Sequence, residues 1–379
     1  KSLFVGIFIL SSVVSTCSSQ SSISASTQLT NNQINCDAMA VTPTPTPTDS
    51  SVDDFVEPIA VDRTSDPLSG ISDGSGGIDG MDEEMKKVLN AMLSELSPEE
   101  IEQAARTSYV YFLAATKEGC VDGPSGLERL RRSKALAMAR RCLVADKGKP
   151  DVALTRMRST LVWRQEMDID GMRTCFTEND ERHATMRSSL SHSMSTGQFV
   201  VRGYDRDGRA LQLLIPRLNV SGDTPEAILA AILYHAERAI AGTERRSGNA
   251  HEKFHVVFDY ARFKISHSMP LAAAKLVVFA LRDHYCERVQ GIYLLDAPLV
   301  FQIFWNLIRP FIDPDTKRKI TFLTGQKEKK KVFGRFFDKE EAVSCILDDG
   351  HLVGSHDVHK YLHEVPFDFA YDEVIDVKE

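Results

Sequence analysis

The 379-residue sequence lacks the patterns that define several common classes of protein. No apolar stretch approaches the roughly 20 residues that a membrane-spanning helix needs, which excludes a polytopic membrane protein. None of the seven cysteines forms a CxxC pair, which excludes a zinc ribbon and a thioredoxin-type motif. A GxSxG elbow, a P-loop and an HExxH pair are all missing. We therefore expect no enzymatic activity, no catalytic residue and no metal site.

Charge is unevenly distributed, although the whole chain carries a net charge of -8. Residues 49–84 contain eleven acidic residues and one basic residue, whereas residues 1–48 contain one of each sign. The remaining residues, 85–379, therefore carry a net charge of +2. The acidic total argues against a nucleic-acid partner, but the surface that binds partners has to be judged on the slightly basic body.

The first 84 residues have the composition of a leader. Lys1 precedes an apolar run at residues 3–10 and then small polar residues, which predicts a secretory signal peptide or, alternatively, reflects a trimmed start. Residues 15–84 are rich in Ser, Thr, Pro, Gly and Asp, so we expect disorder there. The odd number of scattered cysteines instead favours reduced thiols and a cytoplasmic protein that is peripheral on membranes. Both localisations, cytoplasmic and secretory, stay open.

Residues 85–175 have the pattern of a helical subdomain. Ser97, Pro98 and Glu100 form a capping-box sequence that begins a helix, and apolar residues then recur at helical spacing. A Gly-rich break separates this helix from two further ones. The predicted helices cover residues 97–113, 127–145 and 151–166.

Strands and helices alternate beyond residue 195, which predicts an α/β fold with a largely parallel sheet. The sequence Asp205 to Gly208 predicts a turn between the first two strands. Residues 292–295 have no polar face, so we expect this strand to be buried on both sides. We assign residues 185–355 to this domain and 356–379 to a C-terminal tail. The predicted strands cover 198–202, 209–218, 254–259, 292–295 and 319–323. The predicted helices cover 224–241, capped by Asp223, 270–284 and 299–308.

The segment from Leu299 to Ile308 carries no charge, and its apolar residues point in every direction of a helix. Such a helix is buried in a protein core or meets lipid. It is too short to span a membrane. Two interpretations therefore remain open, a core helix and a lid over an apolar cavity that also touches the bilayer.

Two sequence blocks resemble signatures of Sec14-like CRAL-TRIO lipid-binding domains. Residues 285–298, YCERVQGIYLLDAP, are similar to the family's YPER…G.IYIVNAP. Trp305 and residues 308–320, IRPFIDPDTKRKI, are similar to its W..IKPFLDP.T..KI. Weaker similarities extend the resemblance over about residues 95–350. It implies an α/β/α fold whose sheet floors a hydrophobic cavity for one lipid, preceded by an N-terminal helical subdomain.

The resemblance also implies roles for individual residues. Glu287 and Lys319 match the acidic residue and the lysine that serve the headgroup in phosphatidylinositol-binding members, and Thr316 matches a phosphate-contacting threonine. The charge-free helix would be the gate, with Leu299, Phe301, Ile303, Phe304, Trp305, Leu307 and Ile308 as its apolar residues. The candidates for lining the cavity are Phe254, Val256, Phe258, Ile292 and Leu294.

We therefore expect a monomer that binds one lipid, most simply phosphatidylinositol or another phospholipid, and exchanges it between membranes. Apart from this lipid we expect no cofactor. Its other partner would be an anionic membrane surface, contacted transiently. A basic run can attract such a surface at about 1 kcal/mol per charge. It consists of Lys327, Lys329, Lys330, Lys331 and Arg335.

Several alternatives remain. Val144 and Asp146 stand where the family carries two basic residues, so one side of the basic headgroup site is missing. The ligand would then be a tocopherol, a retinoid or a sterol, which leaves Lys319 without a phosphate partner. A regulatory interaction module that keeps the fold without exchanging lipid is another alternative. A metal site in the C-terminal tail, which the family lacks, would use His351, His356, His359 and His363.

Overall fold

The computed structural model describes residues 82–116, 123–177, 180–219, 222–308, 314–336 and 356–374. The predicted signal peptide, the predicted disordered leader up to residue 81, and His351 lie outside the described residues. So do the side chains of Phe304, Leu307, Ile308 and Thr316. The last residues of the predicted leader, Glu83 and Glu84, instead begin a helix. Within the described ranges, the longer helices are all too polar to cross a bilayer.

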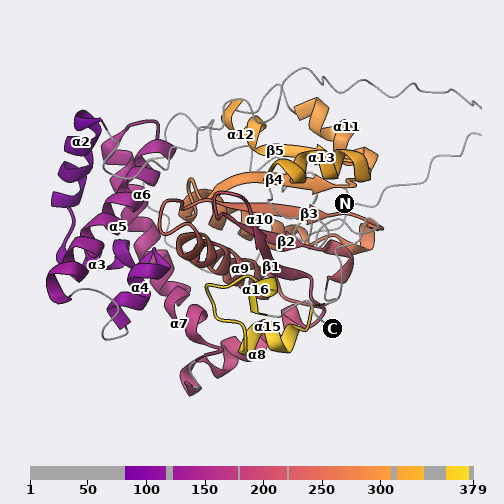
Figure 1. Cartoon of the computed structure of the whole chain (residues 1–379), viewed down its shortest axis with the longest axis horizontal. Coiled ribbons are helices and arrows are strands. Elements are labelled where there is room, and N and C mark those ends of the chain that lie inside the picture. The colour runs from indigo at the N-terminus through magenta and orange to yellow at the C-terminus, as the bar shows by residue number, and fades with distance from the viewer. Residues whose placement is uncertain are drawn as a thin grey trace, which may run out of the picture. The chain divides into compact units, whose positions relative to one another are not determined.

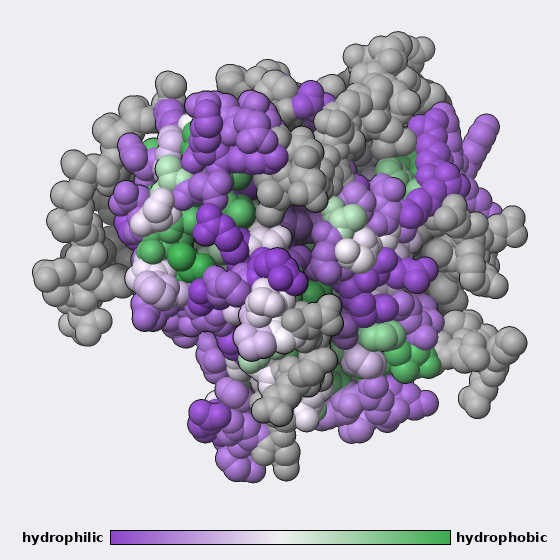
Figure 2. Space-filling view, turned by 60° about the vertical axis from the view of Figure 1, so that its left-hand side comes forward, coloured by the Kyte–Doolittle hydropathy of each residue, from purple (hydrophilic) through white to green (hydrophobic). Residues whose placement is uncertain are grey.

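The first part of the described chain is helical and has a core of its own. Apolar residues of α2, α5 and α6 form this core, among them Leu89, Leu143 and Met157. Figure 1 shows these helices grouped together at one side of the strands. Figure 2 shows a surface on which hydrophilic residues dominate and hydrophobic ones form only small patches. The helices are α2 (Glu83–Ser94), α3 (Pro98–Arg106), α4 (Tyr109–Thr116), α5 (Gly123–Ala145), α6 (Pro150–Glu166) and α7 (Ile169–Thr174).

The predicted capping box at Ser97 is confirmed, but the helix that follows it is shorter than predicted. The backbone N–H of Glu100 donates to Ser97 Oγ, and the Glu100 carboxylate accepts from the Ser97 N–H. The predicted helix is interrupted after Arg106, because the buried carboxylate of Glu244 accepts hydrogen bonds from Ser108 Oγ at 2.8 Å and from the Tyr109 N–H at 2.9 Å. These groups belong to the start of α4, where backbone N–H groups have no partner within the helix.

The second part contains a five-stranded sheet in the order β1-β2-β3-β4-β5. β1 and β2 are antiparallel, and the other neighbours are parallel, as expected. The predicted turn between β1 and β2 is present, with Gly208 at φ 82° and its N–H donating to the Asp205 carbonyl at 2.9 Å. β4 is buried along nearly its whole length, as predicted. The strands are β1 (Phe199–Tyr204), β2 (Ala210–Leu214), β3 (Phe254–Asp259), β4 (Val289–Leu295) and β5 (Ile320–Leu323).

Helices surround this sheet (Figure 1). The helix α9 (Pro225–Arg246) is capped by Thr224, whose Oγ1 accepts from the Ala227 N–H at 3.2 Å. The predicted cap at Asp223 is therefore wrong. The predicted strand 209–218 ends early because Pro216 begins a short 3₁₀ turn. The helices are α8 (Ala184–Met194), α9 (Pro225–Arg246), α10 (Leu271–His284), α11 (Leu299–Ile308), α12 (Pro314–Lys319), α13 (Gln326–Phe336), α15 (Val358–His363) and α16 (Tyr371–Val374).

The sheet separates two apolar clusters, because successive side chains of a strand point to opposite faces. Val257, Tyr293 and Leu295 belong to the large cluster that contains the apolar side of α9. Ile292 and Leu294 belong to a smaller cluster with α11. The α11 side of the sheet is therefore the side on which an apolar ligand can be accommodated.

Candidate functional site

Three charged residues meet at one edge of the sheet. Lys253 directly precedes β3, Glu287 lies two residues before β4, and Lys319 directly precedes β5. Because these neighbouring strands are parallel, the residues before them meet at the same edge. The Lys253 Nζ is 3.1 Å and the Lys319 Nζ is 3.3 Å from the same oxygen, Glu287 Oε2. The structure therefore brings the predicted residues Glu287 and Lys319 together and adds Lys253.

The local charges favour an ionised Glu287. Burial by itself would raise the pKa of Glu287, but the ammonium groups of Lys319 and Lys253 outweigh it and hold this pKa below its usual value. Burial lowers the pKa of Lys253, and Lys319 and Arg140 lower it further by repulsion, while Glu287 opposes the shift. The three side chains of the sheet edge are 18 to 28% exposed, so a ligand can reach them. Two ammonium groups against one carboxylate leave one positive charge for an anion.

The backbone of Glu287 has a conformation that is unusual for a residue other than glycine. Its φ is 54°, in the left-handed region that favours glycine. For an ordinary residue this conformation costs about 1–2 kcal/mol. In this conformation the Glu287 carboxylate contacts both Lys253 and Lys319.

The α11 helix is half-buried, so the interpretation as a core helix needs correction, whereas the interpretation as a lid over an apolar cavity stays a prediction. Phe301 and Trp305 are 3% and 8% exposed and pack in the cluster of Ile292 and Leu294. On the other side of the same helix, Leu299 is 69% and Ile303 is 58% exposed. One face of α11 thus closes over the sheet and the other presents large apolar side chains to solvent.

Four of the five cavity-lining candidates lie on the side of α11. Ile292 and Leu294 are members of its cluster, and Val256 and Phe258 pack against it. Phe254 instead lies in the cluster on the α9 side. The register of β3 against β4 shifts directly after Phe254, which interrupts the alternation that the prediction assumed.

An apolar cavity of about 60 Å³ lies where β1 begins and β2 and β3 end, and Phe301 is the α11 residue in its wall. Phe258, Tyr260 and Phe301 contribute to its wall, together with Phe199 and Leu214 from the antiparallel end of the sheet. Pockets for small ligands usually measure about 300–1,000 Å³. This cavity by itself is therefore too small for a lipid.

The basic run on α13 is only partly available to a membrane. Lys327, Lys330 and Lys331 are exposed. Lys329 is 3% exposed and forms an ion pair with Asp296, so its inclusion in the surface run is wrong.

The remaining sequence candidates do not assemble into a site. Among the residues that the structure describes, no group of three or more His, Cys, Asp or Glu side chains is arranged to hold a metal. His356 is buried, and His359 stacks near His363 with ring centroids 4.6 Å apart. Asp146, which replaces a basic residue of the family, forms an ion pair with Arg156 at 2.8 Å. It therefore connects the end of α5 to α6.

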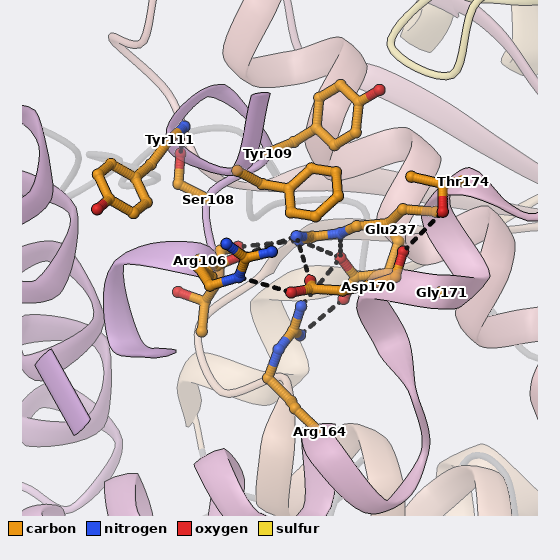
Figure 3. A network of polar contacts seen from close by, with 12 residues as sticks. Arg106, Ser108, Tyr109, Tyr111, Arg164, Asp170, Gly171, Thr174 and Glu237 are labelled. Atoms are coloured by element: carbon orange, nitrogen blue, oxygen red, sulfur yellow. Dashed lines mark hydrogen bonds and ion pairs between the residues drawn. The ribbon is translucent and has the colours of Figure 1, made fainter. Parts of the chain in front are cut away.

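A buried ion-pair network positions the loop that carries Glu287. Glu237 on α9 is fully buried and accepts from Arg164 at 2.8 Å and from the Tyr285 hydroxyl at 2.6 Å. Burial would raise the pKa of Glu237, but Arg164 and Arg173 hold it far below its usual value. Figure 3 shows Arg164 directed at Glu237, with Asp170 beside them. Sequence reasoning missed this network, since its members come from four separate segments.

Residues 194–344 match the family described as CRAL/TRIO domain. This match shows that the chain contains a CRAL/TRIO domain over 151 of its 379 residues. Glu287 and Lys319 both lie inside the matched segment.

Proteins similar to this chain include three curated relatives and one solved structure. A CRAL-TRIO domain-containing protein of Schizosaccharomyces pombe is 28% identical over 200 residues, which are 52% of this chain and 18% of the relative. The phosphatidylinositol transfer protein CSR1 of Eremothecium gossypii is 26% identical over 173 residues, 45% and 38% of the two chains. The phosphatidylinositol transfer protein PDR17 of Saccharomyces cerevisiae is 24% identical over 188 residues, 48% and 50%. The matched parts thus span between about a fifth and half the length of these relatives. The crystal structure of Sfh5 aligns with a TM-score of 0.48 at 15% identity, covering 76% of this chain and 95% of that chain.

Proposed function

We propose that the protein binds one phospholipid, preferably phosphatidylinositol, and exchanges it between membranes. The acyl chains lie beneath α11, and the headgroup lies at the sheet edge formed by Lys253, Glu287 and Lys319. The observation that carries this proposal is that both ammonium groups contact the same oxygen of Glu287. Two of the similar proteins are named phosphatidylinositol transfer proteins, which supports the choice of lipid.

The chemistry of the edge suits an inositol phosphate headgroup. Lysine ammonium groups bind phosphate oxygens through charge-assisted hydrogen bonds. The Glu287 carboxylate accepts hydrogen bonds, and inositol hydroxyls are suitable donors. Choline offers no hydroxyl donor and carries a positive charge that the two lysines repel. The site therefore favours phosphatidylinositol over phosphatidylcholine.

The apolar side explains why the protein is needed for exchange. A diacyl lipid has roughly thirty methylene groups, each worth about 0.8 kcal/mol when removed from water. Passage through water is therefore negligible, and the cluster around Phe301 and Trp305 has to replace the bilayer. Since the cavity measures only about 60 Å³, α11 has to move away to admit the chains. Its exposed Leu299 and Ile303 can contact the bilayer during this movement.

A second candidate function is the carriage of a hydrophobic ligand without a phosphate, such as a sterol. The same apolar cluster would serve it, and Glu287 would then pair with the two lysines for structural reasons alone. A surface ion pair of this kind contributes about 0–1 kcal/mol. The shared contact of two cations with one carboxylate favours the phospholipid.

Lipid extraction and native mass spectrometry of the purified protein test the proposal. After incubation with liposomes of phosphatidylinositol, phosphatidylcholine and cholesterol, we expect one phosphatidylinositol per protein. Selective retention of cholesterol would support the second candidate. Protein that retains no lipid from these liposomes would overturn both.

A further inference from the structure

Two cysteine sulfurs from distant parts of the chain lie in contact next to the sheet edge. Cys142 Sγ on α5 is 3.6 Å from Cys286 Sγ, although 144 positions separate the two residues. Cys142 is buried and Cys286 is partly exposed. Cys286 follows Tyr285, which is anchored to Glu237, and directly precedes Glu287.

We propose that Cys142 and Cys286 form an oxidation site at which a peroxide joins the two thiols in a disulfide. A disulfide bond is about 2.05 Å long, so the sulfurs have to approach one another by about 1.5 Å. The sulfurs already touch, so a small movement of the loop before β4 is sufficient. The bond would connect the helical part of the chain to the loop that carries Glu287.

The surroundings make Cys286 the thiol that reacts first. The two thiols share a hydrogen bond, and Arg141 and Arg156 attract a thiolate at Cys286, so the pKa of Cys286 is lowered although its partial burial opposes the shift. The thiolate is the reactive form of cysteine. The pKa of Cys142 is raised by the same hydrogen bond and by burial.

A small cavity gives an oxidant access to this pair. Both cysteines line it, together with Arg141, Arg164 and Arg288. Its volume is about 20 Å³, which is enough for one water-sized molecule. Hydrogen peroxide, with only two heavy atoms, is a small oxidant and is the one that we propose for this site.

The reaction balances with one hydrogen peroxide. The Cys286 thiolate attacks one peroxide oxygen, an S–O bond forms, the O–O bond breaks, and the leaving hydroxide takes the proton that Cys286 had released. The Cys142 sulfur then loses its proton and attacks the sulfenic acid. The S–S bond forms, the S–O bond breaks, and a second water leaves. Two electrons pass from the two sulfurs to the peroxide.

The test is peptide mapping of the full chain by mass spectrometry after treatment with hydrogen peroxide and alkylation of the remaining free thiols. We expect a Cys142-containing peptide joined to a Cys286-containing peptide, with a mass lower by two hydrogen atoms, and its loss after reduction. Because the bond closes a long loop, we also expect the Tm to rise by about 5–10 °C. This measurement requires no lipid, so its outcome is independent of the proposed function.

Three variants make the test specific. Cys142→Ser and Cys286→Ser should abolish the linked peptide. Cys175→Ser should keep it, because Cys175 is buried in the large cluster on the α9 side of the sheet, and burial raises the pKa of its thiol to about 12. In Cys142→Ser the sulfenic acid at Cys286 has no partner, so dimedone labels it more strongly than in the wild type. The proposal is overturned if both thiols are still alkylated after peroxide treatment. It is equally overturned if either cysteine pairs with a different one, or if Cys286 ends as a sulfinic acid.

Discussion

Replacing Lys319 with alanine separates headgroup recognition from a purely structural ion pair. Lys319 Nζ lies 3.3 Å from Glu287 Oε2, which Lys253 Nζ also contacts at 3.1 Å. In the Lys319→Ala variant Glu287 keeps one cationic partner, so the edge becomes neutral and loses the charge that attracts phosphate. We expect transfer of phosphatidylinositol to fall while transfer of phosphatidylcholine is retained.

The size of the effect follows from the exposure of the lysine. A hydrogen bond to a charged group contributes about 1.5–3 kcal/mol. Lys319 is 28% exposed, so the lower part of this range, about 1.5–2 kcal/mol, applies and corresponds to a 10- to 30-fold loss of phosphatidylinositol affinity. Loss of the ion pair itself should lower the free energy of unfolding by at most about 1 kcal/mol, because the pair is partly exposed.

The assay is transfer of labelled phosphatidylinositol or phosphatidylcholine between donor and acceptor vesicles, at equal concentrations of folded protein. Lys275→Ala is the matched control, because it removes the same charge from an exposed position on α10. It should leave both transfer rates unchanged. Equal losses of both lipids in Lys319→Ala would refute the reasoning and show that this lysine only supports the fold.

Three further predictions test other parts of the structure. The double variant Leu299→Asp/Ile303→Asp should reduce vesicle binding several-fold. Because both side chains are exposed, it should change the free energy of unfolding by less than about 1 kcal/mol. Phe301 is buried, so Phe301→Ala should instead lower the free energy of unfolding by about 3–5 kcal/mol. Arg173→Ala, which leaves a buried carboxylate with one arginine fewer, should lower the free energy of unfolding by about 3–5 kcal/mol in urea titrations. Burial lowers the pKa of His235 to about 3, so only the unfolded state takes up its proton between pH 6.5 and 3. The free energy of unfolding should therefore fall as the pH drops below about 6.5, by about 2 kcal/mol at pH 5 from this histidine alone.

Each of these predictions has a clear contrary outcome. Unchanged vesicle binding in the double variant of α11 would remove this helix from the membrane contact. A urea midpoint for Arg173→Ala equal to that of the wild type would show that the remaining arginine satisfies the carboxylate. For His235, the pH dependence should weaken in His235→Leu, and an identical dependence would assign the effect to other groups.

The fold was predictable from the sequence because its signals are local. Turn residues at Asp205 to Gly208 and the apolar strand before Asp296 identified the sheet, and Ser97 and Glu100 marked a helix start. The break between α3 and α4 was not predictable, because the acceptor that causes it, Glu244, is more than 130 residues away. The sequence does not show which distant carboxylate meets a helix start.

The candidate site was predictable only in part, for a similar reason. Resemblance identified Glu287 and Lys319, whereas Lys253 joins them through the parallel pairing of β3 with β4. Residues that directly precede adjacent parallel strands lie at the same edge of the sheet. This rule would have predicted Lys253, but it requires the strand order, which the sequence does not show. Lys329 looked like its neighbours in the basic run, and only the fold shows that it is buried against Asp296.

The capping of α4 by Glu244 has a consequence for how the protein can be dissected. Glu244 and Glu237 belong to the segment that matches the family, but the arginines and N–H groups that satisfy them come from residues 106–173. Expression of residues 194–344 alone would remove most partners of these buried carboxylates, leaving Tyr285 for Glu237 and Arg288 for Glu244, and would expose the apolar side of α9. The smallest autonomous folding unit is therefore larger than the matched segment, and the helices before it act as an obligatory part of that unit.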